Sequence, residues 1–267
     1  MIHLARTPDG PPPPPAVQKL RIRYAKRGRL RFTSHRDFQR ALERALRRAN
    51  VPMAYSAGFT PHPKVSYANA APTGAASEAE YLEISLAAER DPEELRAALD
   101  AALPPGLDVV QVVPAAPGAL ADRLTGSRWE IVLPDTDPQA VAGAVEQFLA
   151  RETVEVERLT KTGRRALDAR SAVLTLEVLA ADQGAGAESD LGRAAMAGGA
   201  PCAILHMVVR HTTPAVRPDD VLTALRAVAD LAPVSPPQVT RLSQGLLDEV
   251  EGTVADPLAT ARDAADA

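Results

Sequence analysis

The first part of the chain alternates between strand-like and helix-like spacing of its hydrophobic residues. Leu20, Ile22 and Tyr24 occupy every second position, and the alternation resumes after the turn Lys26–Arg29 and reaches Thr33. This pattern predicts a pair of strands or one long bent strand. Apolar residues then recur every three or four positions, which predicts a helix. Its buried face should contain Phe38, Ala41, Leu42, Ala45, Leu46 and Ala49.

Local signals fix the ends of this helix and complete a first unit. Ser34 is a suitable N-cap, and the helix should end before Pro52, because the residue before a proline disfavours helical geometry. A second helix should begin at Asp91, with a proline at its first helical position. Strand-like segments occur at 64–68, 81–86 and 107–113. The resulting order is β-α-β-β-α-β, which is typical of ferredoxin-like folds.

A similar order of elements begins again after residue 126. Helices should begin at Pro138 and Pro218. The Gly/Ala-rich stretch at 182–200 is predicted to be a mobile insertion between strands. This second half contains more strand candidates than the pattern needs. They lie at 129–133, 154–159, 172–179, 203–209 and 238–242.

We therefore predict an α+β protein of two tandem ferredoxin-like domains with antiparallel sheets. A length of 267 residues is sufficient for two such domains. The first domain should cover 18–114 and the second 127–247, joined by a linker at 115–126. We expect a disordered proline-rich lead at 1–17 and a disordered tail at 248–267.

Composition favours a globular protein of the cytoplasm. Hydrophobic residues make up 46% of the chain and charged residues 24%, and no apolar run approaches the roughly 18 residues that span a bilayer. The amino terminus has no apolar core of the kind that a signal peptide needs, and Pro11–Pro15 would interrupt one. The only cysteine, Cys202, excludes an internal disulfide and an iron-sulfur cluster held by this chain alone.

Charge is distributed unevenly along the chain. Between Lys19 and Lys64 there are thirteen Lys and Arg residues but only two acids, Asp37 and Glu43, which gives this segment a net charge of +11. Since the whole chain carries −4, the remainder must carry −15. Such asymmetry indicates a polyanionic partner for one face of the molecule.

Four arginines follow helical spacing on the face opposite the predicted core. They are Arg36, Arg40, Arg44 and Arg47, and we call them the arginine stripe. Guanidinium groups match the geometry of phosphates and keep their charge. Lys26, Arg27, Arg29 and Arg31 could extend this RNA-binding surface from the preceding turn. The alternative is an ordinary solvated helix face.

The loop 58–64 is a second candidate for RNA contact. Two prolines flank His62 and restrict the backbone, so that less entropy is lost when the loop becomes ordered. Phe59 and His62 could contact a base, and Lys64 a phosphate. The alternative is a tight structural turn with Phe59 in the core.

Some further residues could bind or react. His35 and His62 are candidates for acid and base in metal-free RNA cleavage, although their spacing does not show that they meet. Asp168 and Arg170 alternate on a possible strand after a basic turn at 161–165, either as an RNA contact or as a surface ion pair. His206 and His211 lack a third ligand, and we expect no metal site. The glycine-containing run 184–186 lacks the context of a phosphate loop.

Several of these segments resemble the radical-SAM-linked family of unknown function, over roughly residues 18–230. The most specific are Arg31–Asp37, Arg44–Ala49 and Tyr55–Lys64, and looser matches are Ser77–Glu83, Leu167–Arg170 and Val216–Leu222. Members are fused to a radical SAM protein or encoded beside one, so the resemblance implies a radical SAM partner. The iron-sulfur cluster and S-adenosylmethionine would belong to that partner, with no cofactor on this chain. Where the family usually has Leu after the Ser-His pair, this chain has Arg36.

We thus expect a non-catalytic RNA-binding accessory protein that works with a radical SAM enzyme on tRNA or rRNA, without membrane contact. One alternative is a metal-independent endoribonuclease using His35 and His62. The tandem ferredoxin-like layout is similar to that of CRISPR repeat-processing endoribonucleases, but a fold does not determine a function. Another alternative is an adaptor that binds only protein.

Overall fold

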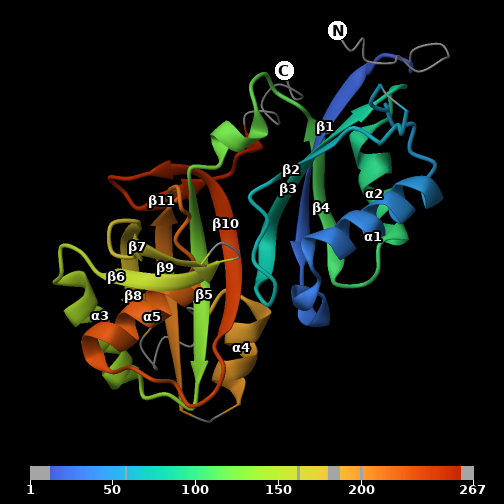
Figure 1. Cartoon of the computed structure of the whole chain (residues 1–267). Coiled ribbons are helices and arrows are strands. Elements are labelled where there is room, and N and C mark those ends of the chain that lie inside the picture. The colour runs from blue at the N-terminus through green and yellow to red at the C-terminus, as the bar shows by residue number, and fades with distance from the viewer. Residues whose placement is uncertain (1–12, 58, 161–162, 180–186, 199–200, 260–267) are drawn as a thin grey trace, which may run out of the picture. The chain divides into compact units, whose positions relative to one another are not determined.

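The computed structural model describes residues 13–57, 59–160, 163–179, 187–198 and 201–259 (Figure 1). In these ranges the chain forms five α-helices and eleven strands, most of which pair antiparallel, so the predicted α+β class is confirmed. The described residues divide into two compact units. The first unit contains the residues up to Ala70, Glu80–Leu120 and the residues from Leu258, and the second contains Ala71–Ala79 and Ala121–Pro257.

The first unit has the predicted order of elements around a four-stranded sheet of order β4-β1-β3-β2. Strand β1 is antiparallel to β4, and β2 is antiparallel to β3. The elements are β1 (Gln18–Lys26), a short 3-10 helix η1 (Gly28–Phe32), α1 (His35–Arg48), β2 (Val65–Ala68), β3 (Ala76–Leu86), α2 (Pro92–Ala102) and β4 (Leu107–Pro114).

One apolar core holds α1 and α2 to this sheet, as alternation along β1 predicts. Leu20 and Ile22 are buried, and Tyr24 stacks on Phe38 of α1 with 4.3 Å between ring centroids. Leu95 and Leu99 bring α2 to the same core. Both helices therefore cover one face of the sheet (Figure 1).

Helix α1 begins and ends at the predicted signals. The Ser34 hydroxyl accepts a hydrogen bond from the Asp37 amide at 3.2 Å, which satisfies a free N–H of the first turn. At the other end Asn50 adopts φ = 49°, and the Val51 amide donates to the Leu46 carbonyl at 3.0 Å. This left-handed residue reverses the chain just before Pro52.

The prediction that a strand continues after the turn Lys26–Arg29 is wrong. Residues Gly28–Phe32 form η1 instead, with the Leu30 amide bonded to the Arg27 carbonyl at 3.0 Å. Strand β1 already has β4 on one side and β3 on the other, so neither of its edges can accept a hairpin partner.

The second unit is built on a sheet of order β10-β5-β9-β8, with β11 paired to β10 and the first residues of β3 running parallel to β10. Its helices are α3 (Pro138–Leu149), α4 (Asp190–Ala197) and α5 (Pro218–Ala229). Its strands are β5 (Gly126–Pro134), β6 (Glu155–Thr160), β7 (Gly163–Asp168), β8 (Val173–Val178), β9 (Cys202–Arg210), β10 (Gln238–Asp248) and β11 (Thr253–Ala255).

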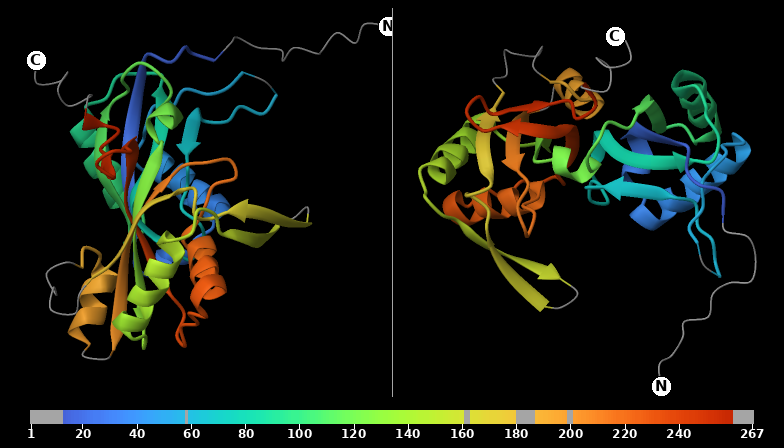
Figure 2. Two further views of the ribbon diagram at one scale, coloured as in Figure 1. Left: turned by 90° about the vertical axis from the view of Figure 1, so that its left-hand side faces the viewer. Right: turned by 90° about the horizontal axis from the view of Figure 1, so that it is seen from above.

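The helices of the second unit lie on both faces of its sheet (Figure 1). Val141 and Phe148 of α3 and Val221 of α5 share a large core with alternate residues of β5 and β9. Helix α4 uses a smaller apolar cluster on the opposite face, around Val132 and Ile204. Strands β6 and β7 pair only with each other and project from the unit (Figure 2).

The β6–β7 hairpin, α4 and β11 go beyond the β-α-β-β-α-β order. The prediction of two simple tandem ferredoxin-like domains is therefore not confirmed. The insertion predicted at 182–200 is corrected, because Asp190–Ala197 form α4, while 182–186 and 199–200 lie outside the described residues. Ser189 caps this helix by accepting from the Gly192 amide, which explains how an Ala-rich segment becomes ordered.

The connecting segments also differ from the prediction in places. The predicted linker contains a short 3-10 helix, η2 (Leu120–Arg123), and the division between the units follows Leu120. The predicted disordered tail is corrected where Thr253–Ala255 pair with the end of β10. Residues 1–12 of the predicted lead and 260–267 of the tail lie outside the described residues. In the described part of the chain, no helix is both long and apolar enough to cross a membrane.

Candidate nucleic-acid interface

The arginine stripe lies on the solvent side of α1. All four of its residues are exposed, whereas Phe38, Leu42 and Leu46 of the same helix are buried. This division follows from the helical period, because residues three and four apart share a face. The predicted separation of a basic face from an apolar face is therefore present in the structure.

Few carboxylates are near the stripe. Arg40 lies 3.9 Å from Asp37, in an exposed pair one turn apart. Over the described ranges, no carboxylate oxygen comes within 4.0 Å of the guanidinium groups of Arg36, Arg44 or Arg47. Exposed ion pairs contribute little free energy, so even Arg40 remains available to a phosphate. Helix α1 consequently presents concentrated positive charge.

The loop that follows α1 is closed by its own hydrogen bonds. The Ser56 amide donates to the His62 carbonyl at 2.9 Å, and the His62 amide donates to the Ser56 hydroxyl at 3.1 Å. The Lys64 amide donates to the Ala54 carbonyl at 2.8 Å. Phe59 is 70% exposed, so the interpretation that buries its ring in the core is wrong. Gly58 lies outside the described residues.

A pocket of about 200 Å³ lies between the end of α1 and this loop. Glu43 and Arg47 line it from the helix, Tyr55 and His62 from the loop, and Met53 from the segment between them. Met53 is buried, while the other four side chains retain exposed surface. The pocket thus combines an apolar base with ionic and aromatic groups near solvent.

His62 and Lys64 also line a second hollow, of about 380 Å³, together with residues of β2 and β3. Its carboxylate, Glu83, is bonded to Lys19 at 3.0 Å and to Arg21 at 3.2 Å. Because these two cations neutralise Glu83, Lys64 adds a further positive charge at this edge of the loop.

The two candidate catalytic histidines are not brought together. The His35 ring packs edge-on against Tyr67 with 4.9 Å between centroids, and its Nε2 lies 3.1 Å from Gln39 Nε2. His62 instead shares the pocket with Arg47, twelve residues further along α1. Glu43 and Arg47, which line this pocket with His62, are eight and twelve residues after His35, which is about 12 to 18 Å of helix.

Tyr67 is in the same region and is held neutral. Burial is the larger cause and the nearby Glu43 charge the smaller, and together they raise the pKa of the Tyr67 hydroxyl to about 12. This ring therefore supports α1 as a packed, uncharged group.

The basic residues 26–31, before α1, contribute less exposed positive charge than predicted. Lys26 is only 5% exposed, and Arg27 is paired with Asp108 at 3.0 Å. The Arg31 guanidinium stacks on the Phe32 ring at 4.7 Å from its centroid, and Arg29 is exposed. Lys26 is therefore removed from the predicted RNA-binding surface, because the end of β1 buries it.

Asp168 and Arg170 have structural roles in the second unit. The Asp168 carboxylate accepts hydrogen bonds from the Val154 amide at 2.9 Å and the Arg170 amide at 3.0 Å. The Arg170 guanidinium donates to the Val173 carbonyl at 2.9 Å and lies above the Phe148 ring. Both side chains organise the turn after β7, and their role as RNA contacts stays a prediction. Lys161 and Thr162 of the predicted basic turn lie outside the described residues.

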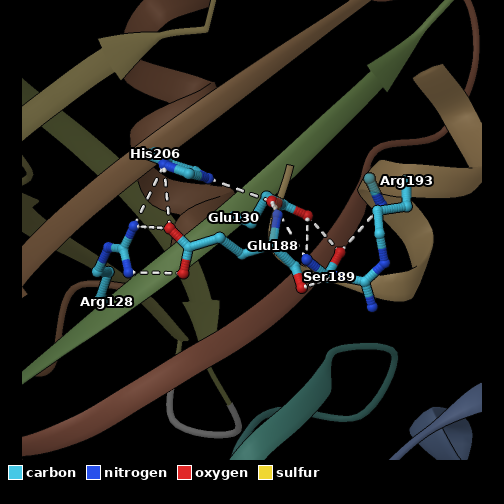
Figure 3. A network of polar contacts seen from close by, with 7 residues as sticks. Arg128, Glu130, Glu188, Ser189, Arg193 and His206 are labelled. Atoms are coloured by element: carbon cyan, nitrogen blue, oxygen red, sulfur yellow. Dashed lines mark hydrogen bonds and ion pairs between the residues drawn. The ribbon is translucent and has the colours of Figure 1, made fainter. Parts of the chain in front are cut away.

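The second unit contains a buried polar network that was not predicted from the sequence (Figure 3). Glu130 on β5 has no exposed surface and accepts hydrogen bonds from the Glu188 amide at 2.7 Å and from the Ser189 hydroxyl. His206 Nε2 on β9 lies 3.2 Å from the same carboxylate. Arg128 bonds Glu188 beside it. A buried carboxylate on the sheet thus holds Ser189, the N-cap residue of α4, in place.

The environment of Glu130 fixes its charge. Burial alone would raise the pKa, but the bonds from His206, Ser189 and the backbone amides outweigh burial and lower the pKa of Glu130 to about 2. The signal in the sequence is one acid between Trp129 and Ile131 in the otherwise apolar run 129–133. Such an acid requires a buried partner.

The other histidine of interest, His211, is also used internally. Its Nδ1 lies 2.7 Å from the Leu124 carbonyl and its Nε2 lies 3.1 Å from the Ser127 hydroxyl. Burial lowers the pKa of His211, partly opposed by the bond to Leu124. Among the described residues, no group of three or more His, Cys, Asp or Glu side chains is arranged to hold a metal ion.

Comparison with known proteins gives a family and no activity. No curated protein matches the chain. The model of a family described as "Uncharacterized protein conserved in bacteria (DUF2344)" matches residues 19–218, which include α1, the loop after it and most of the second unit. The chain therefore belongs to the DUF2344 family.

Proposed function

We propose that this protein binds structured RNA through the arginine stripe and the loop that follows α1. The observation that carries the proposal is the exposed row of guanidinium groups with a single long ion pair, Arg40 to Asp37, along the described part of the stripe. From Arg36 to Arg47 the helix advances about 16 Å, which is long enough to reach several phosphates of one strand.

The loop supplies the second type of contact that RNA-binding proteins use. Phe59 offers an exposed ring on which a base can stack, and Lys64 offers an ammonium group for a phosphate. Hydrogen bonds between Ser56 and His62 keep the two sides of the loop together, which lowers the entropy lost on binding.

We also propose that both units are elaborated ferredoxin-like domains. The strand orders β4-β1-β3-β2 and β10-β5-β9-β8 place the first and third strands of each unit at the centre and the fourth beside the first. The β6–β7 hairpin and α4 would then be insertions on a common plan.

The partner we propose is a radical SAM enzyme acting on tRNA or rRNA. The support is the resemblance of segments such as Tyr55–Lys64 to proteins linked with such enzymes, together with the single cysteine. In this arrangement the protein holds the RNA, and the partner supplies the iron-sulfur cluster and S-adenosylmethionine. Affinity purification of the tagged full chain from its own cells, with and without nuclease treatment, tests this association.

RNA binding is tested by reversing charge on the stripe. The Arg40→Glu/Arg44→Glu variant should lose binding to total tRNA in a filter or anisotropy assay at moderate salt. A matched control is Arg151→Glu/Arg226→Glu, which makes the same charge change at exposed positions of the second unit. Wild-type affinity should fall steeply with salt, and single Arg→Ala changes in the stripe should each reduce the slope of log K against log salt by about 1.

The proposal fails if the stripe variant binds tRNA as tightly as wild type. Association with a partner protein that survives nuclease treatment, with no RNA co-purifying, would instead support an adaptor that binds only protein.

A further inference from the structure

We propose that the pocket between α1 and the loop receives one unpaired guanine base of the bound RNA. This inference rests on the proposed RNA-binding function and adds base specificity to it. The pocket lies beside Arg47, the last residue of the arginine stripe, so a strand that follows the stripe reaches the pocket mouth.

The pocket contains an acceptor and a donor that do not satisfy each other. Glu43 and Arg47 are one helical turn apart and both line it, yet within the described structure their charged atoms form no ion pair within 4.0 Å. A ligand that offers N–H donors to Glu43 and a negative group to Arg47 would satisfy both. A nucleotide has this combination, with donors on its base and charge on its phosphate.

The carboxylate selects among the bases. A carboxylate has only acceptor oxygens, and it pairs best with two adjacent donors. Guanine offers them on its Watson–Crick edge, as N1–H and the N2 amino group. Adenine, cytosine and uracil have only one donor group on that edge, so the second carboxylate oxygen of Glu43 would face an acceptor.

The size and walls of the pocket suit a single base. At about 200 Å³ it is smaller than the roughly 300 Å³ at which pockets for drug-sized ligands begin, so the ribose and phosphate would remain outside. Tyr55, which is 42% exposed, and His62 offer flat rings beside the opening. Stacking of an extruded base on such rings is the usual way in which single-stranded RNA is bound.

The test compares four single-stranded RNA oligonucleotides by fluorescence anisotropy with the full chain. Each is a uridine 12-mer, either unmodified or with one central guanosine, adenosine or cytidine. Wild type should bind the guanosine oligonucleotide about tenfold tighter than the other three. Glu43→Gln should abolish this preference and still bind the all-uridine oligonucleotide, and its thermal unfolding should match wild type because the position is not buried.

A matched control separates the pocket from the stripe. Arg36→Ala/Arg40→Ala should weaken binding of all four oligonucleotides by the same factor and leave the guanosine preference intact. Equal wild-type affinities, a preference for another base, or a guanosine preference that survives in Glu43→Gln would overturn the pocket proposal and leave RNA binding standing. Failure of wild type to bind any oligonucleotide or tRNA would overturn both.

Discussion

His206 Nε2 on β9 lies 3.2 Å from the Oε2 atom of Glu130 on the neighbouring strand β5. The same carboxylate accepts from the Ser189 hydroxyl and the Glu188 amide at the start of α4. One buried acid therefore joins two strands of the sheet to a helix that lies on it, and the first predictions concern this junction.

Removing the Glu130 carboxylate should destabilise the second unit. Glu130→Ala leaves the Glu188 and Ser189 amides and the His206 ring without their acceptor, which we expect to cost about 3 kcal/mol of unfolding free energy. Urea unfolding followed by circular dichroism measures the change. Glu146→Ala, at an exposed position of α3, is the matched control and should change stability by less than about 0.5 kcal/mol.

Stability should also depend on acidity through this carboxyl group. The folded pKa of Glu130 is about 2, below the ordinary 4.5, so the unfolded chain binds the proton more readily. The contribution of Glu130 is therefore complete above pH 4.5 and lost as the pH falls toward 2. Unfolding free energies measured between pH 6 and pH 3 should fall more steeply for wild type than for Glu130→Gln. Parallel curves would contradict this assignment.

Two glycine substitutions should have opposite effects. A Cβ at Gly192 would lie 2.4 Å from Glu130 Oε1, a side-chain atom that its hydrogen bonds hold in place. We expect Gly192→Ala to cost about 2 kcal/mol through overpacking. Gly143 lies in α3, and a Cβ added there would have nothing within 4 Å of it.

The matched substitution Gly143→Ala should therefore stabilise the protein by about 0.5–1 kcal/mol, because alanine loses less entropy in a helix. Thermal unfolding of the two variants beside wild type measures the difference. If Gly192→Ala were as stable as wild type, α4 could shift away from the sheet without loss of unfolding free energy, which would contradict the prediction.

Phe59 should affect binding without affecting folding. Its ring is 70% exposed, so Phe59→Ala should leave the melting temperature unchanged. Loss of base stacking should weaken binding of single-stranded RNA by about 1–2 kcal/mol. Val234→Ala removes a similarly exposed apolar side chain from the second unit and should change neither the melting temperature nor the binding of RNA. A reduced melting temperature for Phe59→Ala would instead assign the ring to the structure of the loop.

The parts of the fold that the sequence predicted are those decided locally. Ser34, the apolar spacing from Phe38 to Leu46, and Pro52 specify α1 through capping, periodicity and chain geometry, all within one short segment. Asp91 with Pro92 specifies the start of α2 in the same way. The exposed face of α1 follows from the same periodicity, which is why the position of the arginine stripe could be predicted from the sequence alone.

The errors arise where distant residues decide the outcome. Residues Gly28–Phe32 alternate like a strand, but both edges of β1 are already occupied by strands from later in the chain. Lys26 looks like a surface cation and is buried at the end of the same strand. Helix α4 has weak local signals, and a carboxylate some sixty residues earlier, Glu130, completes its cap. Likewise, the sequence could not show that His35 and His62 lie apart, because the position of His62 depends on where the loop after α1 packs against that helix.

The small apolar cluster beneath α4 has a consequence for local motion. Helices α3 and α5 share the large core around Phe148 and Val221, whereas α4 reaches the sheet through a few side chains near Val132 and Ile204 and through the bonds to Glu130. Opening α4 therefore exposes far less apolar surface than global unfolding. Its backbone amides should exchange with deuterium well before those of α3. The face of β5 and β9 that α4 covers would become accessible while the rest of the second unit stays folded.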